Sequence, residues 1–252
     1  MSGDTKRLLN RFGDYEDPTN MSVDDWKKRW DKEQTEFHLP KVHPMLEKHL
    51  GALVQGRSKL RFFIPLCGKS VDMRWLLEQG HGVVGCEGVD KGCQEFLQEN
   101  KMKYTASPMK SCEGTVYRSQ CSPLTLYRCD VFDLRREDVG QFDCIWDRGS
   151  FVAIPVSKRK RYADIIVSLM KPDCRYLLDC FLLNNEQFAG PPFSCTENDI
   201  NTFYGSYCAV KKLDEKDAMT DLQRGWGISY FTDQVFLIRM KKRPHVGSSL
   251  IW

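Results

Sequence analysis

The sequence has no apolar run of the length that a membrane span requires, no CxxC pair and no large excess of one charge. Its longest apolar stretches fall well short of the ~18 residues needed to cross a bilayer. Residues 1–7 are polar, so they lack the apolar segment of a secretory signal. The net charge of +3 is too small by itself to predict binding to nucleic acid or to an anionic membrane. We therefore expect a monomeric, cytoplasmic protein that binds neither nucleic acid nor membranes.

The eleven cysteines are scattered along the chain, without the spacing of a metal site or a redox pair. Cys86, Cys144 and Cys180 fall inside apolar segments that are typical of strands. A free cysteine packs as a small hydrophobic residue, and a reducing compartment keeps it free. The cysteines are therefore predicted to be unpaired core thiols, and no metal site is predicted.

The chain is long enough, at 252 residues, to bury a substantial core. Residues 1–20 are polar and lack periodicity, so they are expected to form a mobile tail. Residues 21–240 are expected to form one domain, in which residues 21–55 are N-terminal helices. Residues 241–252 are expected to form a flexible C-terminal tail.

Apolar strand-like segments alternate with amphipathic helical segments from residue 60 onward. Strands are predicted at 61–66, 82–87, 115–119, 124–130, 142–147, 175–183, 207–213 and 229–240. Helices are predicted at 70–79, 89–100, 158–170 and 196–204. This alternation predicts a doubly wound α/β fold, with a mostly parallel sheet covered on both faces. Only a weak helical pattern separates the last two strands, which favours an antiparallel pair at the end of the sheet.

The loop after the first predicted strand indicates a nucleoside-binding site without a phosphate pocket. The Gly68-Lys69-Ser70 triplet resembles the end of a P-loop, but that motif needs glycine at position 63, which is Phe. A dinucleotide fingerprint needs three glycines so that the backbone can approach a pyrophosphate, and only Gly68 stands near this turn. S-adenosylmethionine remains, because it has a ribose and an adenine to bind but no phosphate.

Polar residues at the ends of several predicted strands support this cofactor. Glu87 ends the second strand and can accept hydrogen bonds from both ribose hydroxyls. Asp130 and Val131 follow a later strand, where the adenine edge would pass. Asp147 and Arg148 end the next one, where the reacting end of the cofactor would lie. In open α/β sheets ligands bind at the carboxyl ends of the strands, so this set predicts a methyltransferase.

A capping-box-like start at Ser22 introduces a helix with Trp26 and Trp30 one turn apart. The pair has two interpretations from the sequence alone. It can dock the helix on the core, or it can form an aromatic lid over a flat ring.

Several segments resemble the thiopurine S-methyltransferase family, and in particular its animal members. They are FFIPLCGK (62–69), GVVGCE (82–87), FDCIWDRG (142–149), GPPF (190–193), WGI (226–228) and the stretch from Asp25-Trp26 through Trp30 to Phe37-His38. The matches run in order from about residue 22 to residue 240. The resemblance implies a class I S-adenosylmethionine-dependent methyltransferase fold, which has a seven-stranded sheet with an antiparallel last strand and here an N-terminal helical lid.

The resemblance also implies roles for individual residues. The lid over the cofactor would run from Trp26 and Trp30 to Phe37. The cofactor pocket would be lined by Leu66, Cys67, Gly68, Glu87, Asp130, Val131 and Arg148. The acceptor would contact Phe37, Arg148 and the loop of Pro191, Pro192 and Phe193.

The chemistry expected of this family requires little from the protein. A sulfonium methyl group is already activated, so catalysis is mostly alignment and desolvation. Arg148 is our candidate for lowering the thiol pKa of the acceptor, because a thiolate is the effective nucleophile. Asp147 either orients Arg148 or is a buried structural carboxylate. Cys67 has no histidine partner implied by the sequence, and direct transfer needs no protein nucleophile.

One departure from the family concerns the acceptor. The family has basic residues shortly before its Trp-Gly segment, and the arginine position four residues before Trp226 is Leu222 here. Arg224 is the remaining candidate to contact the acceptor. The acceptor is therefore predicted to be a small thiol such as a thiopurine, with two alternatives left open: another small thiol or chalcogen acceptor, and a paralogue that binds S-adenosylmethionine without turnover.

Overall fold

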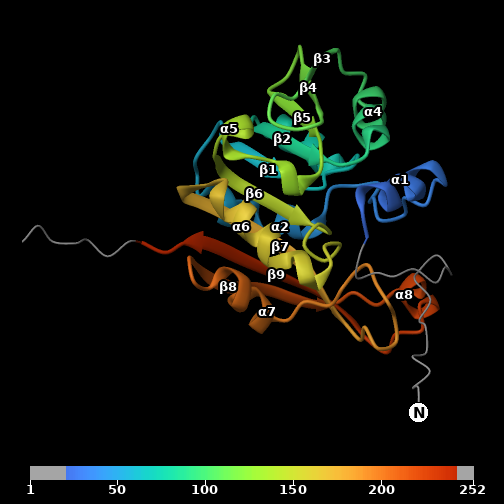
Figure 1. Cartoon of the computed structure of the whole chain (residues 1–252). Helices are drawn as coiled ribbons and strands as arrows, with labels where there is room; N and C mark the ends of the chain where they lie inside the picture. The colour runs from blue at the N-terminus through green and yellow to red at the C-terminus, as the bar shows by residue number, and fades with distance from the viewer. Residues whose placement is uncertain (1–20, 243–252) are drawn as a thin grey trace, which may run out of the picture.

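The computed structural model describes residues 21–242, which form one mixed β-sheet with helices on both faces (Figure 1). The predicted tail at 1–20 and residues 243–252 of the predicted C-terminal tail lie outside the described residues.

The described residues contain nine strands in one sheet, in the order β3-β4-β5-β2-β1-β6-β7-β9-β8. The strands β5, β2, β1, β6 and β7 are parallel, whereas β4 joins β5, and β9 joins β7, in antiparallel pairs. The strands are β1 (Arg61–Ile64), β2 (Gly82–Glu87), β3 (Tyr104–Pro108), β4 (Thr115–Ser119), β5 (Leu124–Arg128), β6 (Phe142–Arg148), β7 (Met170–Leu183), β8 (Cys208–Asp217) and β9 (Phe231–Met240).

Two helices precede β1, and the others lie in the connections between successive strands. The helices are α1 (Val23–Asp31), α2 (Pro44–Val54), α3 (Val71–Glu78), α4 (Asp90–Glu99), α5 (Arg136–Val139), α6 (Arg159–Ser168), α7 (Glu197–Tyr204) and α8 (Asp221–Gly225), with short 3₁₀ helices at η2 (Val131–Asp133) and η3 (Val156–Lys158). The capping box predicted for α1 is present, because the side chains of Ser22 and Asp25 each accept a hydrogen bond from the other's backbone N–H.

The two faces of the sheet carry separate apolar clusters. Along β6, Cys144 and Trp146 belong to the cluster covered by α2, α3 and α4, whereas Ile145 belongs to the cluster covered by α6 and α7. Successive residues of a strand point to opposite faces, so one strand supplies both cores. The same alternation places the neighbours Asp147 and Arg148 on opposite faces of the sheet.

The predicted doubly wound fold and the antiparallel last strand are confirmed, with two differences in detail. The sheet has nine strands, whereas the residues predicted eight and the family resemblance implied seven; the added strand is β3, which pairs with β4 at the β5 side of the sheet. Strand β3 was not predicted, because it is short, largely exposed and ends in Pro108. Strand β7 also begins at Met170 instead of Arg175. Met170 pairs with Phe142 and Arg175 with Cys144, and the pairing register of β6 and β7 shifts between these two pairs.

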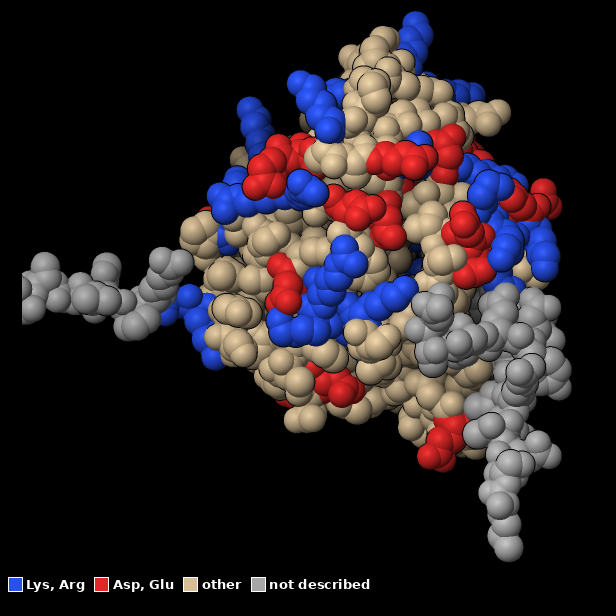
Figure 2. Space-filling view, viewed as in Figure 1, with Lys and Arg blue, Asp and Glu red and all other residues tan. Residues whose placement is uncertain are grey.

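The face of the molecule in Figure 2 carries charges of both signs. Lysine and arginine side chains alternate with aspartate and glutamate over the face shown in Figure 2, as expected from the small net charge. Among the described residues, no helix is long and apolar enough to cross a membrane.

Candidate active site

The carboxyl ends of the parallel strands bring together residues that lie far apart in the sequence. Strand β1 lies between β2 and β6, so the Glu87 end of β2 and the Arg148 end of β6 lie on the two sides of the loop after β1. Helix α1 lies beside this end of the sheet in Figure 1. The tertiary structure therefore brings Glu87, Arg148 and the loop after β1 together at the carboxyl ends of the strands, where open α/β proteins bind their ligands.

Glu87 is buried and holds the loop after β1 in place. Its Oε2 accepts a hydrogen bond from the N–H of Gly68 at 2.9 Å, and its Oε1 accepts one from the N–H of Val89 at 2.8 Å. Burial raises the pKa of Glu87, while these backbone donors oppose the shift. Leu66 and Gly68 adopt positive φ values of 42° and 48°, which turn the loop sharply.

His38 fills the space that the missing side chain of Gly68 leaves open. A Cβ atom on Gly68 would lie 2.2 Å from the His38 Nε2. That nitrogen accepts a hydrogen bond from the N–H of Lys69 at 3.1 Å, and Nδ1 lies 3.2 Å from the carbonyl oxygen of Thr35. Burial is the main reason that the pKa of His38 falls to about 4, so the ring is neutral near pH 7. The imidazole therefore connects the N-terminal segment to the loop after β1.

The aromatic residues of the N-terminal segment form one cluster at the site. Phe37 contacts the rings of Trp26 and Trp30 at centroid distances of 5.9 and 6.2 Å, in edge-to-face geometry. Trp30 is 2 % exposed, and its ring occupies the space beside Gly92, where a Cβ atom would lie 2.9 Å from Trp30 and 3.2 Å from Glu87. The cluster therefore borders Glu87, so the Trp pair lies at the predicted cofactor site and is also packed on the protein.

Arg148 connects the same segment to β6, because its Nη1 donates a hydrogen bond to the carbonyl oxygen of Phe37 at 2.5 Å. Its Nε is buried and has no hydrogen-bond partner among the described residues. A guanidinium has five N–H donors, so the residue keeps donors for a ligand.

Asp147 lies on the other face of β6 and is completely buried. Its Oδ2 accepts hydrogen bonds from the hydroxyl groups of Tyr162 and Tyr176 at 2.6 and 2.8 Å, and its Oδ1 accepts one from the N–H of Phe151 at 3.2 Å. Burial raises the pKa of Asp147, and the tyrosine hydroxyls oppose the shift. Within the described part of the chain, none of the hydrogen bonds to Asp147 comes from Arg148. These contacts favour the structural interpretation of Asp147 over an orienting role.

Asp130, Val131 and Cys67 are held by local contacts. Asp130 Oδ1 accepts the N–H of Phe132 at 2.9 Å and so caps η2, whose first residue, Val131, is buried. Burial raises the pKa of the Cys67 thiol well above its ordinary value, which makes a thiolate nucleophile at this position unfavourable.

The two predicted acceptor regions lie in different environments. The Gly190–Pro191 and Pro191–Pro192 peptide bonds are cis, and Arg159 holds this loop by donating hydrogen bonds to the carbonyl oxygens of Phe193 and Ser194, both at 3.0 Å. Pro192 is buried in this loop. Arg224, by contrast, is exposed on α8 and lies 3.7 Å from the exposed Asp221. Its predicted contact with the acceptor stays a prediction.

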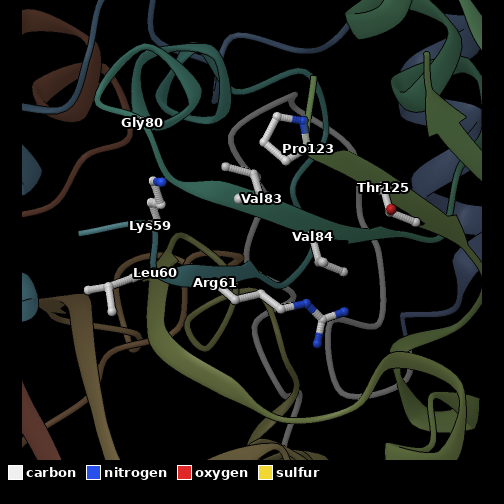
Figure 3. Close-up of a pocket in the computed structure, with 9 residues that line it drawn as sticks. Lys59, Leu60, Arg61, Gly80, Val83, Val84, Pro123 and Thr125 are labelled. Atoms are coloured by element: carbon white, nitrogen blue, oxygen red, sulfur yellow. The ribbon is translucent and has the colours of Figure 1, made fainter. Parts of the chain in front are cut away.

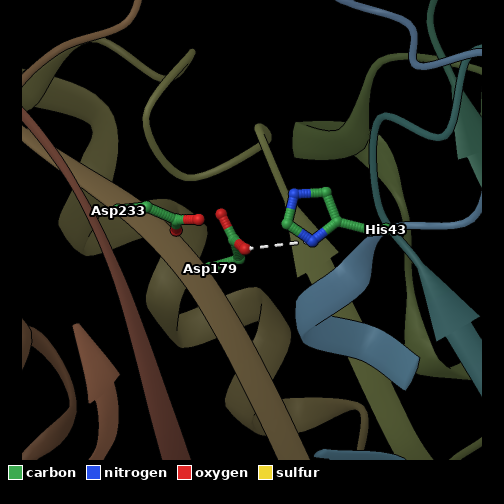
Figure 4. A group of neighbouring side chains, drawn as sticks. All are labelled: His43, Asp179 and Asp233. Atoms are coloured by element: carbon green, nitrogen blue, oxygen red, sulfur yellow. Dashed lines mark ion pairs between the residues drawn. The ribbon is translucent and has the colours of Figure 1, made fainter. Parts of the chain in front are cut away.

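A group of buried ionisable residues that was not predicted lies on the Arg148 face of the sheet. His43, Asp179 and Asp233 place one nitrogen or oxygen each within 4.8 Å of one another (Figure 4). Asp179 interrupts the apolar run of β7, and a carboxylate in a buried-type strand was the signal that could have found the group.

A surface hollow lies at the other end of the parallel strands, where they begin. It is lined at the beginnings of β1, β2 and β5 by residues that include Lys59, Leu60, Gly82 and Pro123 (Figure 3). Because ligands of open α/β sheets bind at the carboxyl ends of strands, we do not assign the site to this hollow.

Comparison with known proteins agrees with this geometry. A family profile described as thiopurine S-methyltransferase matches residues 21–241. A probable thiopurine S-methyltransferase from Danio rerio is 40 % identical over 222 residues, which cover 88 % of this chain and 96 % of that protein. The thiopurine S-methyltransferase of Bos taurus is 36 % identical over 222 residues, which cover 88 % and 91 %.

Solved structures show the same fold at low sequence identity. A SAM-dependent methyltransferase from Anabaena variabilis aligns with a TM-score of 0.60 at 14 % identity and covers 90 % of this chain and 98 % of that one. The profile and the relatives confirm the family that the sequence motifs predicted. This chain belongs to the thiopurine S-methyltransferase family.

Proposed function

We propose that this protein transfers a methyl group from S-adenosylmethionine to the sulfur of small heterocyclic or aromatic thiols such as thiopurines. The proposal depends on one observation. Glu87 and Arg148 lie at the carboxyl ends of the parallel strands on either side of β1, beside the aromatic cluster of Trp26, Trp30 and Phe37, in a chain of this family. Residues 21–240 would act as one methyltransferase domain.

The residues around Glu87 fit a nucleoside. A carboxylate offers about four lone-pair positions, and backbone donors occupy only some of those on Glu87, so the ribose hydroxyls can take others. Trp26, Trp30 and Phe37 provide flat apolar surfaces that suit the adenine ring or the acceptor ring. Leu66, Cys67, Gly68, Asp130 and Val131 would complete the pocket.

Arg148 would provide the positive charge that the acceptor needs. When bound, S-adenosylmethionine supplies a methyl group already activated by its sulfonium. The guanidinium of Arg148 would stabilise the acceptor sulfur as a thiolate, and its hydrogen bond to Phe37 would couple this charge to closure of the N-terminal segment. Pro192 and its neighbours would form a wall of the acceptor pocket.

The test is a methyl-transfer assay with the full-length chain, S-adenosylmethionine and either 6-mercaptopurine or thiophenol, with the S-methyl product identified by mass spectrometry. Arg148→Ala is expected to lower kcat/KM about 10- to 150-fold, the equivalent of one lost charge-assisted hydrogen bond. Arg74→Ala is the matched control, because Arg74 is exposed on α3 and pairs with Glu78. Equal activity of the Arg148 variant and the wild type would contradict the assignment.

A second acceptor class is favoured by one observation. Leu222 is exposed where the family has an arginine, and Arg224 lies on the surface, so the basic contacts expected before Trp226 are not assembled at Arg148. A higher kcat/KM for thiophenol than for 6-mercaptopurine would identify this protein as a general thiol methyltransferase. Binding of S-adenosylmethionine with no transfer to any thiol would indicate a binding protein instead.

We also propose that the protein acts as a monomer in the cytoplasm. All eleven cysteines are free, and nine of them are buried. Reduced cysteines are typical of an intracellular protein, which supports this location.

A further inference from the structure

Asp179 and Asp233 are buried carboxylates with unusually few hydrogen-bond partners. Asp179 is 0 % exposed and Asp233 is 3 % exposed. Both oxygens of Asp179 and the Oδ1 of Asp233 receive no N–H or hydroxyl donor among the described residues, so the two carboxyl groups hydrogen-bond to each other by sharing a proton. Burying a polar atom without a partner is costly, and each such atom in a native structure calls for an explanation.

His43 does not satisfy Asp179. Its Nδ1 lies 3.4 Å from the Asp179 Oδ2, but this nitrogen already accepts the N–H of Met45 at 3.3 Å and so presents a lone pair to the carboxylate. Burial is the main cause that lowers the pKa of His43 to about 3, so the ring is neutral near pH 7. His43 therefore provides neither a positive charge nor a hydrogen to the pair.

The carboxylates share a face of the sheet with Arg148. Asp179 is the direct cross-strand neighbour of Arg148 in the parallel β6–β7 pair. Asp233 lies two residues before Val235, the partner of Asp179 in the β7–β9 pair, and so it points to the same face. The unpartnered Nε of Arg148 thus lies on the same face of the sheet, and at the same end, as these three carboxyl oxygens.

A divalent metal ion fits this cluster poorly. The Nδ1 lone pair of His43 already accepts a backbone hydrogen bond. Lys216 lies 3.3 Å from the Asp233 Oδ2, and Arg148 is the neighbour of Asp179, so a metal ion would be a third cationic group beside two carboxylates. The cluster already has cationic neighbours, and what its carboxyl oxygens lack is hydrogen-bond donors.

We propose that Asp179 recognises the ring N–H of a heterocyclic thione acceptor whose sulfur is bound by Arg148. This inference rests on the proposed function and defines its acceptor class. In such a ring the N–H nitrogen and the thione sulfur are bonded to the same carbon atom, so the ligand presents a hydrogen-bond donor and an acceptor side by side. That pattern matches the carboxylate oxygens of Asp179 and the N–H groups of Arg148. The acceptor sulfur binds the N–H donors of Arg148 that the Phe37 carbonyl oxygen leaves free, among them the unpartnered Nε.

The same contact provides an acceptor for the ring N–H proton that the reaction releases. The acceptor sulfur forms its bond to the methyl carbon as the bond from that carbon to the sulfonium sulfur breaks, which leaves neutral S-adenosylhomocysteine. A thione with a ring N–H reacts in its neutral form, so Arg148 binds its thiocarbonyl sulfur, whereas a simple aryl thiol is bound as the thiolate. As a sulfur electron pair forms the S–CH₃ bond, the C=S π pair moves to sulfur, the ring nitrogen lone pair forms a C=N bond, and the nitrogen becomes cationic.

Burial and the neighbouring Asp233 raise the pKa of Asp179, so the two carboxyl groups hold one proton and one negative charge between them. The ring N–H proton passes through Asp179 to this pair, so one positive and one negative charge are lost together and the products are neutral.

The test compares two acceptors of the same size, pyridine-2-thione, which has the ring N–H, and thiophenol, which has a C–H at that position. Asp179→Asn in the full-length chain is expected to lower kcat/KM for pyridine-2-thione about 10- to 100-fold, and for thiophenol by less than about 2-fold. Asp173→Asn is the matched control, because Asp173 lies on the same strand with its side chain 70 % exposed.

Two further measurements separate this inference from its alternatives. Calorimetric binding of pyridine-2-thione in the presence of S-adenosylhomocysteine should weaken about 10-fold or more in the variant, whether or not turnover occurs. Wild-type turnover of either acceptor tests the proposed function separately. Equal losses for both acceptors, or unchanged binding of the thione, would overturn the inference. Activity that is abolished by EDTA and restored by Mn²⁺ would overturn it in favour of a metal site.

Discussion

The role of Glu87 can be tested by substituting Gln and Ala at this position. If the carboxylate binds the ribose, Glu87→Ala removes a charge-assisted hydrogen bond worth about 1.5–3 kcal/mol. The dissociation constant for S-adenosylmethionine should then rise about 10- to 150-fold. Glu87→Gln keeps one oxygen acceptor of the same size and should lose less affinity.

The same carboxylate also stabilises the folded protein, so stability has to be measured separately. Glu87→Ala removes the acceptor of two backbone N–H groups, those of Gly68 and Val89. An unsatisfied buried donor costs about 1–3 kcal/mol, so urea unfolding should show a clear loss of stability in the Ala variant.

Isothermal titration calorimetry of the folded variants with S-adenosylhomocysteine is the decisive assay for Glu87. Glu78→Gln serves as the control, because Glu78 is exposed on α3 and pairs with Arg74. An unchanged dissociation constant in both Glu87 variants would refute the ribose assignment and leave Glu87 with only its structural contacts.

Two further predictions concern stability. Asp147→Ala should lower the free energy of unfolding by about 2–6 kcal/mol, because it leaves the hydroxyl groups of two buried tyrosines, Tyr162 and Tyr176, without an acceptor. Urea unfolding measures this, and an unchanged stability together with a large loss of kcat would restore the orienting role. For His38, the folded pKa of about 4 lies below the ordinary value of 6.5. Its contribution is therefore present above pH 6.5 and falls by up to about 3 kcal/mol as the pH drops toward 4. The free energy of unfolding, measured by urea denaturation between pH 4 and 7, should depend less on pH in His38→Gln than in the wild type. An identical pH dependence in both proteins would contradict this.

Much of the fold follows from local patterns in the sequence. Apolar runs predicted the parallel strands, and the polar residues at their carboxyl ends, such as Glu87 and Arg148, predicted the end of the sheet at which we propose the site. The β3 strand could not be found in this way, since Tyr104–Pro108 is short and largely exposed, and its pairing with β4 gives it its structure.

The candidate site was less accessible to local reasoning. Asp147 and Arg148 are adjacent in the sequence, which made a joint role plausible, yet the strand turns them to opposite faces. His38 and His43 carry no motif of their own, because their contacts with Lys69 and Met45 depend on how the N-terminal segment lies on the sheet.

The sequence by itself determined the α/β class, the absence of a phosphate-binding glycine pattern and the family, because each depends on residues close together in the chain. Only the tertiary structure decided which side chains meet. It set Asp147 among tyrosines, left Arg224 on the surface and brought Asp179 beside Arg148. Those contacts arise from strand order and register, which join segments that local sequence does not relate.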